Sequence, residues 1–223
     1  TLKERQRLLP YWNTLWWAAS AEPSEAGLPI VRPLWLTYGA GADGGDGDAP
    51  TNATAAAEEL QELLSMEFSW TLGADLLVRP IVTEERERVQ GAGGGTPTYL
   101  PGPAASAVWF SVATGARLAG GGWHDVPTPL NTTAVFQRGG SIIPRRRRVR
   151  RSALMAVWDP ISLEVAPDAA AHASGRLLLD DGESVLSVGG AALLRLAFAC
   201  DAAGGAAGSD GGVQRVSVDA ATG

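Results

Sequence analysis

Short apolar runs separated by glycine- and proline-rich turns follow one another from about residue 66 onward, and this alternation limits the fold more than any other feature. The runs are PTYLP, AVWFSV, AVFQRGGSIIP, ISLEVAP and GRLLLDDGESVLSV. Such spacing is typical of β-sandwich domains. Hydrophobic residues make up 45% of the 223 residues, which is enough for a substantial core. We therefore predict a mainly β protein.

The first part of the chain has a different pattern. Residues 2–21 predict an amphipathic helix whose apolar face is Leu8, Leu9, Trp12, Leu15 and Trp16. Pro10 should kink or divide this helix, because proline cannot donate a helical hydrogen bond. The run GLPIVRPLWLTY then predicts a short buried strand, and residues 55–64 predict a short helix. A helix followed by a buried strand is the repeating unit of an α/β barrel.

Two segments have almost no large apolar residues, residues 39–54 and the tail that begins at residue 201. Because they cannot bury enough surface to order themselves, we expect flexible segments there, followed by a strand at VQRVSV. The acidic spacing of DGGDGDAPTNAT is similar to that of a calcium loop. It lacks the glutamate that closes such a loop, so the interpretation as a solvated loop is favoured.

Six arginines occupy seven positions, Arg145 to Arg148 with Arg150 and Arg151, in a chain whose net charge is −6. A dedicated nucleic-acid binder is usually basic overall, and base stacking usually needs aromatic residues within such a run. Neither condition is met. We expect a solvated surface segment balanced by acidic neighbours or solvent and no nucleic-acid partner, although a nucleic-acid tract stays open as the third-ranked hypothesis.

Six segments in the same order resemble the C-terminal part of glycoside hydrolase family 31 α-glucosidases. They are LLPYWNTLWWAAS, GLPIVRPLW, LGADLLVRPIVTEE, YLPGPAASAVWFSVATG, VFQRGGSIIP and LLLDDGES. The resemblance covers about residues 8–185. Within the family, the chain is most similar to the glucosidase II branch, the catalytic α subunits of the endoplasmic reticulum. The passage that carries this similarity contains the arginine run, RRS, a methionine and DPISLEVA. The segment FSWTLGADLL departs from the family pattern at Ser69, Trp70 and Asp75.

The resemblance implies a domain organisation. Residues 1–65 would be the last helix and strand of a (β/α)8 catalytic barrel, with a flexible insertion at 39–54. Residues 66–153 would form the proximal C-terminal β-sandwich and residues 154–223 part of a distal β domain. Within the sandwich, Gly139 and Gly140 would allow a tight turn, and Pro144 would end the pairing of its strand. Asp180, Asp181 and Gly182 would make a hairpin turn, which is favoured over a metal site.

The resemblance also implies an activity that this chain does not carry alone. The parent protein would remove terminal α-linked glucose from N-linked glycans with two aspartates. Both aspartates lie upstream of the matched region in the family, so no catalytic residue, cofactor or metal ligand is assigned, and the chain alone should be inactive. The implied partners are an oligosaccharide bound by the missing barrel and a regulatory β subunit, in the lumen of the endoplasmic reticulum. The sequons at Asn52 and Asn131 are candidate N-glycosylation sites.

Other candidate residues favour structural roles. His124 and His172 have no cysteines at zinc-ligand spacing and are expected to be exposed loop residues. Ser141 lacks the nucleophile-elbow pattern, and GAGGG at 91–95 lacks the Lys-Ser/Thr of a phosphate loop. The tryptophans at 12, 16, 17 and 35 could form a saccharide platform, but packing against a barrel is favoured. The second-ranked hypothesis for the chain is thus a non-catalytic carbohydrate-binding or structural β module.

The abrupt start of the sequence suggests a fragment. The chain starts inside an expected helix, without an initiator methionine or a signal peptide, so any targeting segment is expected upstream.

No apolar run approaches the roughly 18 residues needed to span a bilayer. The single cysteine, Cys200, allows no internal disulfide.

Overall fold

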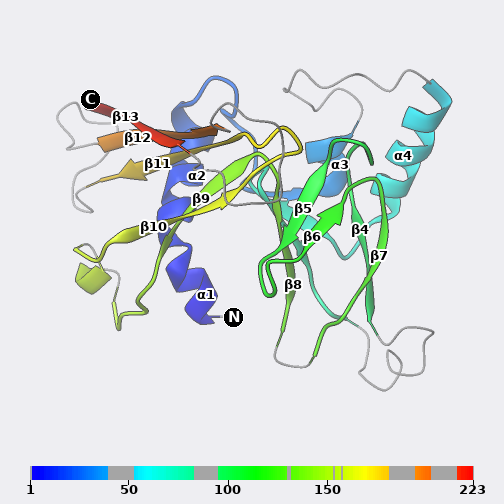
Figure 1. Cartoon of the computed structure of the whole chain (residues 1–223), viewed down its shortest axis with the longest axis horizontal. Coiled ribbons are helices and arrows are strands. Elements are labelled where there is room, and N and C mark those ends of the chain that lie inside the picture. The colour runs from blue at the N-terminus through cyan, green and yellow to red at the C-terminus, as the bar shows by residue number, and fades with distance from the viewer. Residues whose placement is uncertain are drawn as a thin grey trace. The chain divides into compact units, whose positions relative to one another are not determined.

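The structure is a computed structural model, and it confirms a mainly β protein. It describes residues 2–39, 53–82, 95–129, 132–152, 154–156, 158–180, 194–201 and 215–222. The contacts divide the chain into two compact units (Figure 1). We call Pro29–Arg138 the central unit, and Thr1–Leu28 together with Gly139–Gly223 the terminal unit. The domain boundaries expected near residues 65 and 153 stay predictions.

The central unit is built on a six-stranded antiparallel sheet in the order β1-β2-β3-β8-β5-β6, with a separate two-stranded pair β4-β7. Two helices, α3 and α4, belong to the same unit (Figure 1). The bounds are β1 Val31–Pro33, α3 Leu34–Tyr38, α4 Ala53–Ser65, β2 Trp70–Leu72, β3 Leu76–Arg79, β4 Thr96–Leu100, β5 Val108–Ser111, β6 Arg117–Ala119, β7 Gly122–Val126 and β8 Ala134–Arg138.

The apolar core of the central unit joins both sheets to both helices. Leu77 of β3 lies directly opposite Phe136 of β8, and both side chains are fully buried. Trp109 of β5 is buried as well and donates its indole N–H to the carbonyl oxygen of Pro101 at 3.0 Å. The remaining buried members of the cluster are Leu34, Leu63, Tyr99, Leu100 and Ala134. The expected helix at 55–64 is confirmed as α4, and its Leu63 is one of these core residues.

The prediction of a strand in GLPIVRPLWLTY is mostly wrong, because only Val31–Pro33 forms a strand. Leu34–Tyr38 forms the short helix α3 instead, with Pro33 as its N-cap residue at φ −64°. A proline with this φ angle favours a helix start and cannot donate to a sheet ladder. The helical turn brings Leu34 into the core, where it is fully buried.

The segment that departs from the family pattern nevertheless forms a regular hairpin. Trp70–Leu72 pairs with Leu76–Arg79 across a turn that contains Gly73 at φ 61°. Thr71 is fully buried in this hairpin, and its hydroxyl lies 2.9 Å from the hydroxyl of Thr37. The replacements at Ser69 and Trp70 therefore leave the strand pairing intact.

The terminal unit contains a five-stranded sheet in the order β10-β9-β11-β12-β13 and the first two helices of the chain (Figure 1). β9 and β11 are parallel and meet at Ser141 and Ser174, and the other neighbours are antiparallel. The bounds are α1 Leu2–Arg7, α2 Leu9–Ala21, β9 Ser141–Arg146, a 3₁₀ turn Leu154–Ala156, β10 Ile161–Ala166, β11 Ala173–Leu179, β12 Leu194–Asp201 and β13 Arg215–Thr222. The sequence analysis predicted each of these strands except β12.

The N-terminal helix is divided near Pro10, as predicted. α1 ends at Arg7 and α2 begins at Leu9, so Pro10 stands in the first turn of α2, where its missing N–H costs nothing. The hydrogen bond from the Leu8 N–H to the Glu4 carbonyl oxygen at 3.0 Å keeps the two helices nearly continuous.

The buried face of α2 differs from the predicted one. Its buried residues are Pro10, Tyr11, Thr14, Leu15 and Ala18, whereas Trp16 is 64% exposed and Leu9 is exposed. This face contacts β9 and β11. The helix is apolar almost all round, so periodicity alone did not select a face. The buried side combines the large residues Tyr11 and Leu15 with the smaller residues Thr14 and Ala18. Among them, Thr14 accepts a hydrogen bond from the Leu178 N–H at 2.9 Å and donates one to the Pro10 carbonyl oxygen at 2.8 Å.

The passage RGGSIIP places a turn before β9. Gly140 has φ 88°, a conformation that favours glycine, so the expected tight turn is confirmed. The prediction for Pro144 was wrong, since this residue stays within β9 and pairs with Leu163 of β10. On the side of β11, the only ladder pair of β9 among the described residues is Ser141 with Ser174, and proline is tolerated where its nitrogen is not needed by a ladder.

Candidate functional site

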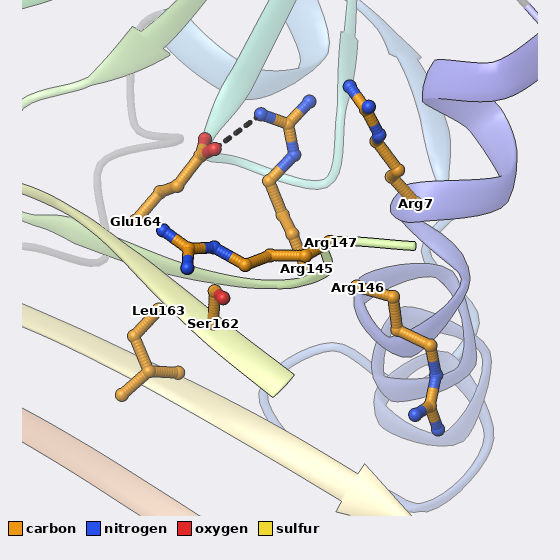
Figure 2. A pocket seen from close by; sticks show the side chains of 7 residues that line it. All are labelled: Arg7, Arg145, Arg146, Arg147, Ser162, Leu163 and Glu164. Atoms are coloured by element: carbon orange, nitrogen blue, oxygen red, sulfur yellow. Dashed lines mark hydrogen bonds and ion pairs between the residues drawn. The ribbon is translucent and has the colours of Figure 1, made fainter. Parts of the chain in front are cut away.

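The arginine run begins on β9 and continues past the end of that strand. Arg145 and Arg146 are the last residues of β9 and pair with Ser162 and Ile161 of β10. Because side chains alternate along a strand, Arg145 and Arg146 point to opposite sides. Figure 2 shows this directly, since Arg146 extends away from the guanidinium groups of Arg7 and Arg145. Arg147 is exposed.

Arg145 lies at the centre of an ion-pair network that joins α1 to the sheet. Its guanidinium group contacts Glu4 at 2.7 Å and Glu164 at 2.5 Å, and its side chain is only 13% exposed. Glu4 also pairs with Arg7 at 2.6 Å. The Glu4 carboxylate thus bridges two guanidinium groups, one from the end of α1 and one from β9.

A second acidic group holds the part of the run beyond the strand. Arg150 donates two hydrogen bonds to the Asp159 carboxylate, at 2.6 and 2.7 Å, and Arg146 donates to the Asp159 carbonyl oxygen at 2.5 Å. The hydrogen bond from Arg150 lowers the pKa of Asp159. Acidic neighbours therefore balance part of the run, as predicted. For Arg147 and Arg151, no salt bridge forms within the residues that the structure describes.

A pocket of about 540 Å³ opens beside this network in the terminal unit (Figure 2). It is lined by Arg7, Arg145, Arg146, Arg147, Ser162, Leu163 and Glu164. The Nε atoms of Arg7 and Arg145 are buried and have no acceptor among the described residues. Sequence reasoning singled out the arginine run but missed this pocket. Glu4 and Arg145 are separated by 141 positions, and no local pattern signals that they meet.

Neither histidine is among the residues that line this pocket, and the environment of one of them was predicted wrongly. His124 is half-buried on β7 rather than in a loop, and one ring nitrogen lies 2.8 Å from the Ala119 carbonyl oxygen. His172 is an exposed residue of a turn, as predicted, with its ring 3.9 Å from Asp201. In the described part of the chain, no three His, Cys, Asp or Glu side chains form a group that could hold a metal ion.

The tryptophans of α2 do not share one environment. Trp12 is half-buried, Trp17 packs under the guanidinium group of Arg195 at 5.5 Å, and Trp16 is largely exposed. In the central unit, Trp35 is 43% exposed. The predicted packing of these residues against a barrel stays a prediction. Ser141 is buried at the start of β9, as a structural residue would be.

Several predictions fall outside the described residues and stay predictions. They concern the two sequons at Asn52 and Asn131, residues 40–52 of the expected insertion, the GAGG segment at 91–94, and the Asp181-Gly182 turn. Among the helices that are described, none has the length and apolar character needed to cross a bilayer.

Comparison with known proteins identifies the family. Residues 27–143 match the glycosyl hydrolase family 31 C-terminal domain. The chain therefore belongs to glycosyl hydrolase family 31, as the resemblance predicted. This match spans the whole central unit and ends on β9.

The relatives are much longer than this chain. It is 36% identical over 183 residues to neutral alpha-glucosidase AB of Sus scrofa, an alignment that covers 82% of this chain and 16% of the relative. A solved structure of a glucosidase II alpha subunit superposes with a TM-score of 0.67 at 25% identity, covering 90% of this chain and 18% of that one. A heterodimeric complex of the catalytic subunit of ER glucosidase II with the binding domain of its regulatory subunit superposes with a TM-score of 0.65 at 24% identity, over 90% of this chain and 19% of that one.

Proposed function

We propose that this chain is the C-terminal portion of an α-glucosidase that hydrolyses terminal α-linked glucose. Its physiological substrate in this proposal is an N-linked glycan. The family membership and the similarity to neutral alpha-glucosidase AB support this proposal. In this proposal the chain contributes the closing helix and strand of the barrel together with the β domains that support it. The catalytic carboxylates come from the part of the protein that these residues do not include.

The side chains of the described residues agree with a supporting role. A retaining glycosidase needs two carboxylates about 5 to 5.5 Å apart, at a site where a sugar can enter. The carboxylates beside the pocket, Glu4 and Glu164, are both bound by Arg145 and serve to join α1 to the sheet. The observation that carries the proposal is the family match over the central unit, whose apolar core includes Phe136 and Trp109.

The proposal extends to a location and a partner. A glucosidase II-type enzyme would act in the lumen of the endoplasmic reticulum, and a regulatory β subunit would bind the catalytic chain. One of the structural relatives is such a heterodimer, which is the reason to include this partner. Co-purification of the longer protein with a co-expressed β subunit tests this part of the proposal. Separation of the two proteins on a sizing column would contradict it.

The test of the activity uses the longer protein that the gene encodes. We expect this longer protein to release p-nitrophenol from p-nitrophenyl α-D-glucoside. A Phe136→Ala variant should lose activity in proportion to its loss of folded protein, and its KM should be unchanged. An unchanged KM follows because Phe136 is fully buried in the supporting unit and touches no substrate. A longer protein without α-glucosidase activity would contradict the proposal.

A carbohydrate-binding module is the second candidate, and exposed tryptophans favour it. Trp123 on β7 is 53% exposed, and its indole N–H donates to Glu62 at 2.8 Å, so the ring is held at the surface. Aromatic faces held in this way can stack on sugars. Quenching of tryptophan fluorescence by glucose oligosaccharides, abolished in Trp123→Ala, would support this candidate. Fluorescence that is insensitive to sugar would exclude it.

A further inference from the structure

We propose that the pocket between α1 and β9 binds a carboxylate side chain of an acidic peptide segment, contributed by a protein partner. This inference does not depend on the proposed hydrolase activity, because all of the residues that carry it lie in the terminal unit. Three observations lead to it, the charge balance of the pocket, its unsatisfied donors, and its size.

The charges around the pocket leave one positive charge uncompensated. Arg7, Arg145 and Arg147 face Glu4 and Glu164, so three guanidinium groups meet two carboxylates. Arg146 also lines the pocket, but its side chain points away and its guanidinium group binds the Asp159 carbonyl oxygen (Figure 2). One more carboxylate would make the group neutral. A doubly charged phosphate would overcompensate it and would face the nearby Glu164.

The hydrogen-bonding capacity of the pocket is also incomplete. The Nε–H groups of Arg7 and Arg145 are buried without an acceptor among the described residues. Buried donors are nearly always paired in folded proteins, because an unpaired one retains the full cost of its desolvation. A carboxylate has about four acceptor positions and can bind two guanidinium donors at once. Ser162 adds a hydroxyl group to the same lining.

The size and the lining of the pocket favour a peptide over a free ion or a nucleic acid. Its volume of about 540 Å³ exceeds that of one carboxylate and leaves room for the backbone that bears it. Among the described residues, no aromatic side chain lines the pocket, so a base finds no aromatic ring to stack on.

The experiment measures the anisotropy of a fluorescein-labelled decapeptide of alternating glutamate and glycine, titrated with the full chain. The matched peptide carries glutamine in place of glutamate. We expect the glutamate peptide to bind and the glutamine peptide to bind at least about tenfold more weakly. Affinity should fall when the salt concentration rises from about 50 to about 300 mM, because the contact is charge-assisted.

The matched variants are Arg147→Gln and Arg151→Gln. Each removes one exposed arginine of the run, but only Arg147 lines the pocket, and neither has a salt bridge within the described residues whose loss would disturb folding. We expect about a tenfold loss of peptide affinity for Arg147→Gln and less than about twofold for Arg151→Gln. Equal losses in both variants would overturn the proposal in favour of unspecific attraction to the run. A failure of the glutamate peptide to bind, or tighter binding of a single-stranded DNA oligonucleotide that Arg147→Gln weakens, would overturn it as well.

Discussion

The two units of the chain bury their apolar residues in different ways. In the central unit, side chains from two sheets and two helices meet in one cluster, where Leu77, Phe136 and Leu100 are completely buried. In the terminal unit, the corresponding cluster of described residues is smaller, with Ile142, Ala173, Leu177, Phe198 and Cys200 buried, and half-buried residues border the cluster in both units. That unit adds a helix on β9 and β11, and ion pairs at the end of β9. The comparison teaches that the unit with the smaller apolar cluster adds a helix and ion pairs to its sheet.

The largest expected effect compares one phenylalanine from each unit. Phe136→Ala should lower the free energy of unfolding by about 3–5 kcal/mol, because it leaves a cavity in a fully buried cluster. Phe198→Ala should cost less, about 2–3 kcal/mol, since half-buried neighbours can relax into the space. Urea unfolding followed by circular dichroism measures both values. A larger cost for Phe198→Ala would contradict the difference between the two cores.

The second prediction tests which face of α2 supports the terminal unit. Leu15→Ala should lower the free energy of unfolding by about 2–4 kcal/mol, because Leu15 is buried. Trp16→Ala should change it by less than about 0.5 kcal/mol, because this neighbouring side chain is 64% exposed. Thermal unfolding of both variants provides the comparison. Similar losses would mean that the sequence-based apolar face was right after all.

The third prediction concerns the polar contact between α2 and β11. Thr14→Val removes the hydroxyl that accepts the Leu178 N–H and leaves that buried donor unpaired, so it should cost about 1–3 kcal/mol. Thr14→Ser keeps the hydroxyl group and serves as the control, with a smaller loss. Amide hydrogen exchange at Leu178 reports the bond directly. Equal protection in Thr14→Val and in the unchanged chain would contradict its importance.

The smallest expected effect on stability at neutral pH concerns Tyr99, a residue of the central unit. Burial and the nearby carboxylates of Glu59 and Glu62 raise the pKa of Tyr99 from 10.0 to about 12. The fold favours the neutral phenol, so this contribution to stability is complete below pH 10.0 and is lost as the pH rises toward 12. Tyr99→Phe should remove that alkaline loss. Unfolding curves across this range check the prediction, and an ordinary tyrosine titration in the folded chain would refute it.

Local patterns predicted much of the fold. The alternation of apolar runs and turns gave most of the strands, Pro10 marked the division of the helix, and Gly140 marked the turn before β9. Each of these features depends on residues close together in the sequence, so the cause is visible in the sequence itself.

Features that depend on distant residues were not predictable. The buried face of α2 is chosen by the sheet beneath it, because tryptophan and leucine occur on several sides of the helix. α3 replaces part of an expected strand because Leu34 fits the core. The arginine pocket requires Glu4 to reach Arg145, and nothing near either residue indicates that contact.

The central proposal is that this chain supports the catalytic barrel of an α-glucosidase and does not itself supply the catalytic carboxylates. The most direct measurement is the release of p-nitrophenol from p-nitrophenyl α-D-glucoside by the purified 223-residue chain, after circular dichroism has shown that the chain is folded. The account predicts no release above the rate without protein. Sustained release by the pure chain would contradict the account, because it would require a catalytic pair of carboxylates within these residues.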